Sequence, residues 1–290
     1  MNALQRSIPL FIVVACAPTA SVIADEEEAR RALAVEKQHV EETLRLGIAE
    51  GRTYDIRVLT DPSTQVELNE RSILRWTNPI TGAYGELFVW THLSRPLVVA
   101  SVYQYYSPDQ YLAIEFQSLA PSELIAARGS EEVWHPSSAG VEFQLLRQAP
   151  RPAASKSERP AQMRTLARGF QVRFTTPEDE REWLRLLPQP NCRYQSEDDQ
   201  ILDGAIFIYA QGTNPEALLL LEARHTKNGD QWYFALGRQT GYQLQGFHDG
   251  EVVWSVPMAL GDQKLLRTEA YTTFFRYSHG SDAGFNRGAP

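Results

Sequence analysis

The stretch GELFVWTHLSRPLVVASV, residues 85–102, aligns without a gap on GAIFIYAQGTNPEALLLL, residues 204–221. The match continues beyond this window at an offset of 118 to 121 residues. Upstream, Arg75-Trp76 corresponds to Arg193-Tyr194. The downstream pairs are Asp109-Gln110-Tyr111 with Asp230-Gln231-Trp232, Val133-Trp134 with Val253-Trp254, and Leu145-Leu146-Arg147 with Leu265-Leu266-Arg267. A unit that recurs in this order predicts an internal duplication.

The matched positions are almost all glycine, proline, aromatic or aliphatic, and such residues set turns and cores. Within each unit, short apolar runs alternate with turn signals. In the first unit the runs are 85–91, 97–105, 110–118 and a hairpin over 124–134; in the second, Asp249-Gly250 marks the hairpin turn. We therefore predict an α+β fold, in which a helix plus an antiparallel five-stranded β-meander occurs twice in tandem.

The first two strands of each unit have no polar face. Leu87-Phe88-Val89-Trp90 in the first unit and Leu218-Leu219-Leu220-Leu221 in the second are continuous apolar runs. Such strands are covered on both sides. We expect a helix on one side and the sister sheet on the other, so that the two sheets pack together. A large, partly closed barrel is the alternative.

Two helices are predicted. Residues 25–51 place Leu33, Val40, Leu44 and Ile48 on one helical face. Residues 176–188 carry capping-box spacing between Thr176 and Asp179, and Pro188 ends the run.

The expected organisation follows from these signals. It is a signal peptide (1–24), an N-terminal helix (25–51), a first repeat unit (52–147), a Pro-rich basic linker (148–162), a second repeat unit (163–277) and a disordered tail (278–290).

The N-terminus has the pattern of a secretory signal. Arg6 precedes an apolar stretch, and the small-residue exit at Val22-Ile23-Ala24 is followed directly by acidic residues. This predicts cleavage after Ala24 and a periplasmic or secreted protein without a transmembrane segment in its mature chain. The alternative is a lipid anchor on Cys16, because Val13-Val14-Ala15-Cys16 has the form of a lipoprotein cleavage site.

Charge excludes one class of partner. The net charge is −8, which makes the chain a poor general phosphate binder, so no nucleic acid is expected. Residues 147–173 nevertheless hold seven basic residues against Glu158 alone. This segment either docks on an anionic surface or lies along the acidic lobes of its own chain. The seven are Arg147, Arg151, Lys156, Arg159, Arg164, Arg168 and Arg173.

Four acids crowd the loop before Gly204, and hard oxygen ligands in a loop suit calcium. Their spacing is not that of an EF-hand loop, and a solvated acidic loop is the simpler interpretation. The candidate ligands are Glu197, Asp198, Asp199 and Asp203. No cofactor is expected.

Other catalytic signals are missing from the sequence. Cys192 lies beside Arg193, whose charge would favour the thiolate of a nucleophilic cysteine. A buried, inert thiol is the simpler interpretation. The histidines show no zinc spacing, and there is no G-x-S-x-G motif. Four tryptophans sit where the sister unit also has an aromatic residue, and we interpret them as core anchors, with ring-stacking platforms for sugars as the alternative. They are Trp90, Trp134, Trp232 and Trp254.

Several strings together resemble an uncharacterised family of exported planctomycete proteins. They are Arg75-Trp76-Thr77-Asn78-Pro79, residues 85–91, Arg95-Pro96, Leu186-Leu187-Pro188-Gln189-Pro190, residues 212–216 and Val253-Trp254-Ser255. The resemblance covers most of the mature chain and implies export without an assigned activity. The chain departs from the expected Gly-Arg-Pro turn at Ser94-Arg95-Pro96.

These observations favour an exported, non-catalytic binding protein whose partner is an extracytoplasmic ligand or an envelope component. Two alternatives stay open: a hydrolase of an extracellular polymer, and a carrier that holds an apolar ligand between the two sheets.

Overall fold

The computed structural model describes residues 20–78, 81–106, 110–197, 199–259 and 265–277. Residues 1–19 of the predicted signal peptide, with Cys16, lie outside these ranges, and so does the predicted tail 278–290. The chain divides into two compact units between Glu41 and Glu42, and every strand belongs to the second. No helix in the described ranges combines the length and the apolar character needed to cross a membrane.

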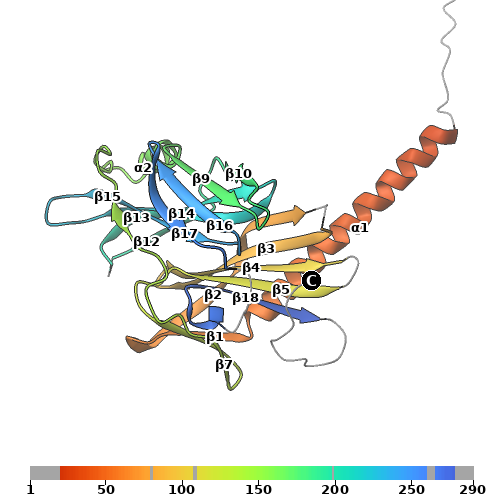
Figure 1. Cartoon of the computed structure of the whole chain (residues 1–290), viewed down its shortest axis with the longest axis horizontal. Coiled ribbons are helices and arrows are strands. Elements are labelled where there is room, and N and C mark those ends of the chain that lie inside the picture. The colour runs from red at the N-terminus through yellow and green to blue at the C-terminus, as the bar shows by residue number, and fades with distance from the viewer. Residues whose placement is uncertain (1–19, 79–80, 107–109, 198, 260–264, 278–290) are drawn as a thin grey trace, which may run out of the picture. The chain divides into compact units, whose positions relative to one another are not determined.

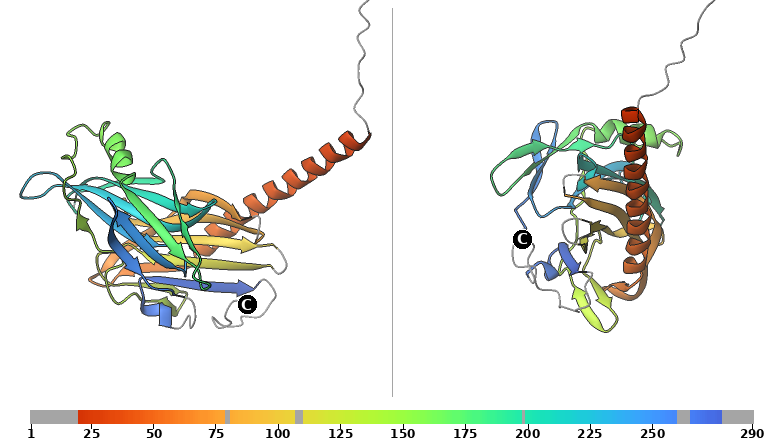
Figure 2. Two further views of the ribbon diagram at one scale, coloured as in Figure 1. Left: turned by 45° about the horizontal axis from the view of Figure 1, so that its top comes forward. Right: turned by 90° about the vertical axis from the view of Figure 1, so that its right-hand side faces the viewer.

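Within the described residues, the fold is mostly antiparallel β-structure with two α-helices (Figures 1 and 2). The helical segments are α1 (Ala20–Gly51), α2 (Arg159–Ala167) and the short 3-10 turn η1 (Leu265–Thr268). In the first half, the strands are β1 (Tyr54–Val58), β2 (Asp61–Asn78), β3 (Ala83–His92), β4 (Arg95–Tyr105), β5 (Tyr111–Ser118), β6 (Leu124–Arg128), β7 (Glu131–Trp134) and β8 (Gln144–Leu145).

The second half carries ten strands in the described ranges. They are β9 (Phe170–Thr175), β10 (Arg181–Trp183), β11 (Arg185–Leu186), β12 (Cys192–Ser196), β13 (Ile201–Gln211), β14 (Asn214–Arg224), β15 (Gln231–Arg238), β16 (Gln243–His248), β17 (Glu251–Val256) and β18 (Tyr271–Tyr277).

These strands form three antiparallel sheets. An eight-stranded sheet has the order β18-β5-β4-β3-β2-β1-β6-β7. A six-stranded sheet runs β11-β13-β14-β15-β8, with β12 also paired to β13, and a four-stranded sheet runs β10-β9-β16-β17. The last strand of each half pairs with the other half: β8 pairs with β15, and β18 pairs with β5. We call these two strands exchanged.

The two halves pair their strands in the same registers. Leu87 lies opposite Ser101 and Ile206 opposite Leu220, and both hairpins then slip at the same place, after Trp90 and after Tyr209. The later hairpins β6·β7 and β16·β17 also share one slip, after Ala126 and after Gly246.

The central strands are buried on both faces, as the continuous apolar runs predict. Phe88 and Trp90 of β3 face a core that includes Leu44 and Ile48 of α1. Leu87 and Val89 face the other way, into a cluster shared with β13 and β14 of the six-stranded sheet. The prediction that the two sheets pack together is therefore confirmed. A third core forms under α2, where Met163 and Ala167 meet the sheets of the second half.

The predicted run of five neighbouring strands differs from the observed strand order. β5 and β6 are not partners; β6 instead pairs with β1, where Ile56 lies opposite Ala126. This pairing spans about seventy residues of chain, and a local sequence pattern cannot reveal it. In the second half, Pro188 and Pro190 separate β11 from β12. Proline cannot donate a ladder hydrogen bond, so the counterpart of the long β2 is broken into short strands.

The helix predicted for 176–188 is wrong. Thr176 and Glu180 close a tight turn instead, since the amide of Glu180 donates to Thr176 Oγ1 at 3.2 Å and Asp179 has a positive φ of 62°. The chain then turns back to pair β10 with β9. The pairing of β10 with β9 has overridden the helix signal at Thr176, because a threonine side chain can bond backbone amides in a turn as well as at a helix start. The second α-helix is α2, which begins at Arg159 inside the range expected to be a linker.

Candidate functional site

Two of the four acids proposed as calcium ligands, Asp199 and Asp203, pair with arginines. The buried Asp203 carboxylate accepts from Arg159 Nε at 3.0 Å and from Arg193 Nη2 at 2.6 Å. Asp199 pairs with Arg95 Nη1 at 2.6 Å. Glu197 is exposed, and Asp198 lies outside the described residues. Within the described ranges, no three His, Cys, Asp or Glu side chains are grouped as metal ligands.

Cys192 is half-buried, and burial raises the pKa of its thiol to about 11. A thiol is nucleophilic only as the thiolate, so this cysteine is a poor nucleophile at neutral pH. Three of the four repeat-matched tryptophans, Trp90, Trp134 and Trp232, are fully buried, as predicted for core anchors. Trp254 differs: it is half-buried and lines a pocket.

The basic segment 147–173 is mostly not neutralised by acids. Among the described residues, only Arg159 of the seven forms an ion pair with a carboxylate, that of Asp203. Lys156 donates to the amide oxygen of Gln195 at 2.7 Å, and other members of the segment bond neutral oxygens in the same way. The segment therefore keeps its positive charge within an acidic protein.

The surface feature that stands out is Trp183. All six tryptophans lie in the described ranges, and Trp183 alone is exposed, at 52%. It lies on the edge strand β10, directly opposite Arg173 of β9, which in turn lies opposite Gln245 of β16. One face of the four-stranded sheet thus carries a row formed by these three side chains.

A second ring completes this face. Phe247 of β16 meets Trp183 edge to face, with ring centroids 5.3 Å apart. The guanidinium of Arg173 lies over both rings, 5.5 Å from the Trp183 centroid and 5.4 Å from that of Phe247. Arg173 also donates to Gln245 Oε1 at 2.6 Å, and Val252, opposite Phe247, is 54% exposed. We call these five residues the aromatic face.

The aromatic face is preorganised. A cation over two rings is worth about 0.5–1 kcal/mol at an exposed site, and the hydrogen bond to Gln245 fixes the guanidinium from the other side. The rings therefore present a fixed surface to solvent without further ordering. Arg173 Nε is buried and has no hydrogen-bond partner in the described part of the chain.

Sequence reasoning missed Trp183 because it assigned 176–188 to a helix. The signal that reveals it is the comparison of the two halves: at the position where the second half pairs Arg173 with Trp183, the first half pairs Arg57 with Gln65. Three of the four tryptophans that match an aromatic residue in the other half are core. Trp183 is not shared, so the strand pairing common to the two halves does not require it.

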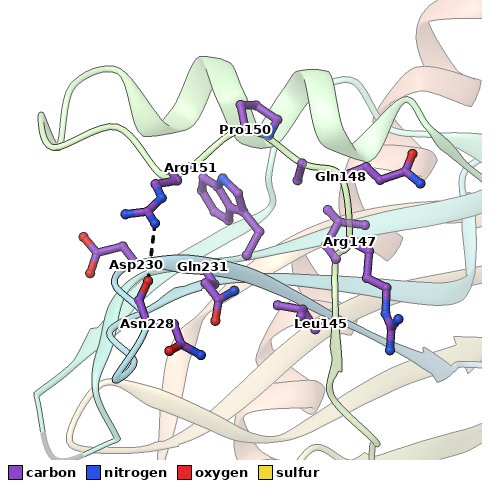
Figure 3. A pocket seen from close by; sticks show the side chains of 11 residues that line it. Leu145, Arg147, Gln148, Pro150, Arg151, Asn228, Asp230 and Gln231 are labelled. Atoms are coloured by element: carbon purple, nitrogen blue, oxygen red, sulfur yellow. Dashed lines mark hydrogen bonds between the residues drawn. The ribbon is translucent and has the colours of Figure 1, made fainter.

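Two pockets, neither lined by residues of the aromatic face, have a size that suits a small ligand. One, of about 460 Å³, lies between residues 145–151 and 228–232 (Figure 3). The other, of about 370 Å³, lies where strands of all three sheets meet, and its lining includes Leu236, Arg238, Trp254, Met258 and Tyr271.

No family model matches this chain, and no curated protein or solved structure is detectably similar to it.

Proposed function

We propose that this protein is a non-catalytic binding protein that acts outside the cytoplasm and holds a saccharide chain against the aromatic face. The observation that carries the proposal is the exposed Trp183, fixed beside Phe247 by Arg173 on the open side of a β-sheet. Aromatic rings stack on the apolar face of a sugar ring, and the neighbouring amide and guanidinium groups can bond its hydroxyls.

The composition of the face supports a sugar over a purely apolar partner. Beside the two rings lie Arg173 and Gln245, and Gln171 lies opposite Phe247. Against a purely apolar partner these polar groups would be buried without hydrogen-bond partners, which costs free energy.

The test is binding of the mature chain to soluble polysaccharides, measured by affinity electrophoresis across neutral and acidic glycans. We expect one class to retard the protein and Trp183→Ala to abolish the retardation, since loss of a stacking ring removes the main contact. Leu93→Ala is the matched control, because Leu93 is also a large exposed apolar residue, at 62%, but lies in the turn between β3 and β4 and not on the four-stranded sheet. Equal retardation of wild type and Trp183→Ala would refute the proposal. A change in oligomeric state instead would make the face a protein interface.

A carrier function is the second candidate, and the 370 Å³ pocket favours it. Leu236, Trp254 and Met258 give this pocket an apolar lining, and the buried Arg238 guanidinium stands at its wall. Displacement of a fluorescent fatty acid by unlabelled fatty acid, lost in Trp254→Ala, would support this function.

We also propose that the chain arose by tandem duplication of a helix-and-sheet unit. Supporting this are the shared registers, the matching strand slips and the reciprocal exchange of β8 and β18. Superposition of the two halves, strand by strand, tests it. Different strand directions at matched positions would contradict it.

We propose export on the sequence of the N-terminus, with a lipid anchor at Cys16 as the alternative. Intact-mass measurement of the protein recovered from its native host should give Asp25 as the first residue. A lipidated Cys16 would change the type of export, and full-length protein in the cytoplasm would refute it.

A further inference from the structure

The pocket in Figure 3 lies between two loops that are distant in sequence. One wall is the segment 145–151, which follows the exchanged strand β8, and the other is the β14–β15 turn with the start of β15, residues 228–232. Its volume of about 460 Å³ is within the range of small-molecule sites, roughly 300–1,000 Å³. Trp232, at 1% exposed, and Leu145 supply its apolar part.

Two arginines contribute to this pocket. Arg147 and Arg151 both line it and both are exposed, and neither forms an ion pair with a carboxylate among the described residues. The amide side chains of Gln148, Asn228 and Gln231 add neutral hydrogen-bonding groups around them. The pocket is therefore lined by guanidinium and amide groups that can donate hydrogen bonds to a ligand.

Arg151 is held in place across the pocket. Its Nη2 donates to the backbone oxygen of Asn228 at 3.5 Å, the contact drawn in Figure 3. Its Nη1 lies 2.9 Å from where a Cβ of residue 229 would stand, so Gly229 leaves the room that the guanidinium occupies. Gly229 also has a positive φ of 89°, a conformation that suits glycine.

The one acid of the pocket is engaged elsewhere. Asp230 lines the pocket, but His225 Nδ1 lies 2.7 Å from its Oδ1. Two guanidinium groups against this single, already bonded carboxylate leave the pocket positive, whereas the whole chain carries −8. The charge is therefore concentrated where a concave surface strengthens its effect.

We propose that this pocket binds an oxyanion, the phosphate or carboxylate group of a small ligand, with Arg147 and Arg151 as its donors. Guanidinium groups match the geometry of both anions and bond them with two donors each. Trp232 and Leu145 would contact the body of the ligand, which points to an acidic or phosphorylated sugar or a molecule of similar size. This site shares no residue with the aromatic face, and the proposal does not depend on the saccharide proposal.

The test is isothermal titration of the full chain at low ionic strength. The probes are inorganic phosphate, glycerol 3-phosphate and galacturonate; vesicles of phosphatidylglycerol and of phosphatidylcholine, tested by co-sedimentation, distinguish a soluble ligand from a lipid headgroup. We expect at least one anionic probe to bind, and Arg151→Gln and Arg147→Gln each to weaken it about tenfold or more, in line with the loss of one charge-assisted pair.

Arg168→Gln is the matched control, since Arg168 is an exposed member of the same basic segment but does not line the pocket. It removes the same charge and should leave the affinity within about twofold. Gly229→Ala should weaken binding without any change in charge, because it displaces Arg151; its thermal melting reports whether the fold persists. If Arg168→Gln weakens binding equally, the overall positive charge of the segment attracts the anion and the pocket does not, which would overturn the proposal. Absence of binding for every probe would also overturn it.

Discussion

The indole of Trp76 lies against the backbone of Gly85, so closely that a Cβ at residue 85 would stand 2.1 Å from Cε2. The two residues are direct cross-strand partners on β2 and β3, and Trp76 Nε1 donates to Ser101 Oγ at 3.1 Å. The second half repeats the arrangement with Tyr194 over Gly204, where the distance is 2.3 Å. An aromatic ring takes the place of a side chain at the same point of each sheet.

Gly85→Ala should therefore destabilise the protein. The added methyl group overlaps a buried ring that cannot move without losing its hydrogen bond, and overpacking of this kind costs about 1–3 kcal/mol. Chemical denaturation measures the loss. The double variant Gly85→Ala with Trp76→Leu should lose less than the sum of the two single changes, because the smaller side chain removes the overlap. Strict additivity would show that the ring and the glycine do not interact.

The β3–β4 turn carries avoidable strain. Leu93 has φ 45° and Ser94 has φ 70°, both in the left-handed region, and Leu93 is 62% exposed. Two-residue turns of this type favour Asn-Gly, and a side chain in that region costs about 1–2 kcal/mol. Leu93→Asn with Ser94→Gly should raise the melting temperature by several degrees. Leu93→Ala keeps the Cβ and should give little gain; a lower melting temperature for the Asn-Gly variant would contradict the strain.

Two glutamates, the half-buried Glu115 and the buried Glu216, make the stability depend on pH. Burial raises the pKa of the Glu115 carboxyl to about 7, although the hydroxyls of Tyr271 and Tyr103 donate to its Oε1. Burial, together with the charge of Glu115, raises the pKa of Glu216 to about 8, and Glu216 Oε2 has no hydrogen-bond partner among the described residues.

The expected sign follows from these pKa values. Below the ordinary value of 4.5, both states of the protein carry protonated carboxyls. As the pH rises, the unfolded chain ionises first and the native carboxyls keep their protons, so the free energy of unfolding falls until the pH passes the native pKa values of about 7 and about 8. Urea denaturation across this window measures the fall. Glu216→Gln should flatten it, whereas Glu131→Gln, at an exposed position, should not. A profile that rises with pH would contradict the raised pKa values.

Trp134 and Trp254 occupy matched positions but should differ in their effect on stability. Trp134 is fully buried, stacks on Phe116 with ring centroids 5.3 Å apart, and donates from Nε1 to the backbone oxygen of Glu269 at 2.9 Å. Trp134→Ala should cost about 3–5 kcal/mol. Trp254 is half-buried, and Trp254→Ala should cost clearly less. Equal losses, measured by denaturant titration, would show that Trp254 is as much a core anchor as Trp134.

The sequence by itself determined the central strands and their burial. Leu87-Phe88-Val89-Trp90 and its counterpart 206–209 are apolar at every position, and that pattern leaves no face for solvent. It also identified α1 and the three buried repeat-matched tryptophans, because hydrophobic periodicity and turn residues act over a few neighbouring positions.

Only the tertiary structure decided the strand order and the candidate sites. The pairing of β6 with β1 and the exchange of β8 and β18 join segments far apart in the chain, and their stability comes from non-local contacts that no local pattern encodes. Residues 176–188 show the same limit. Thr176 caps a turn instead of a helix, because the chain after it pairs with β9 as strand β10. That turn is what brings Trp183 beside Phe247, so the aromatic face exists only once the sheet has formed.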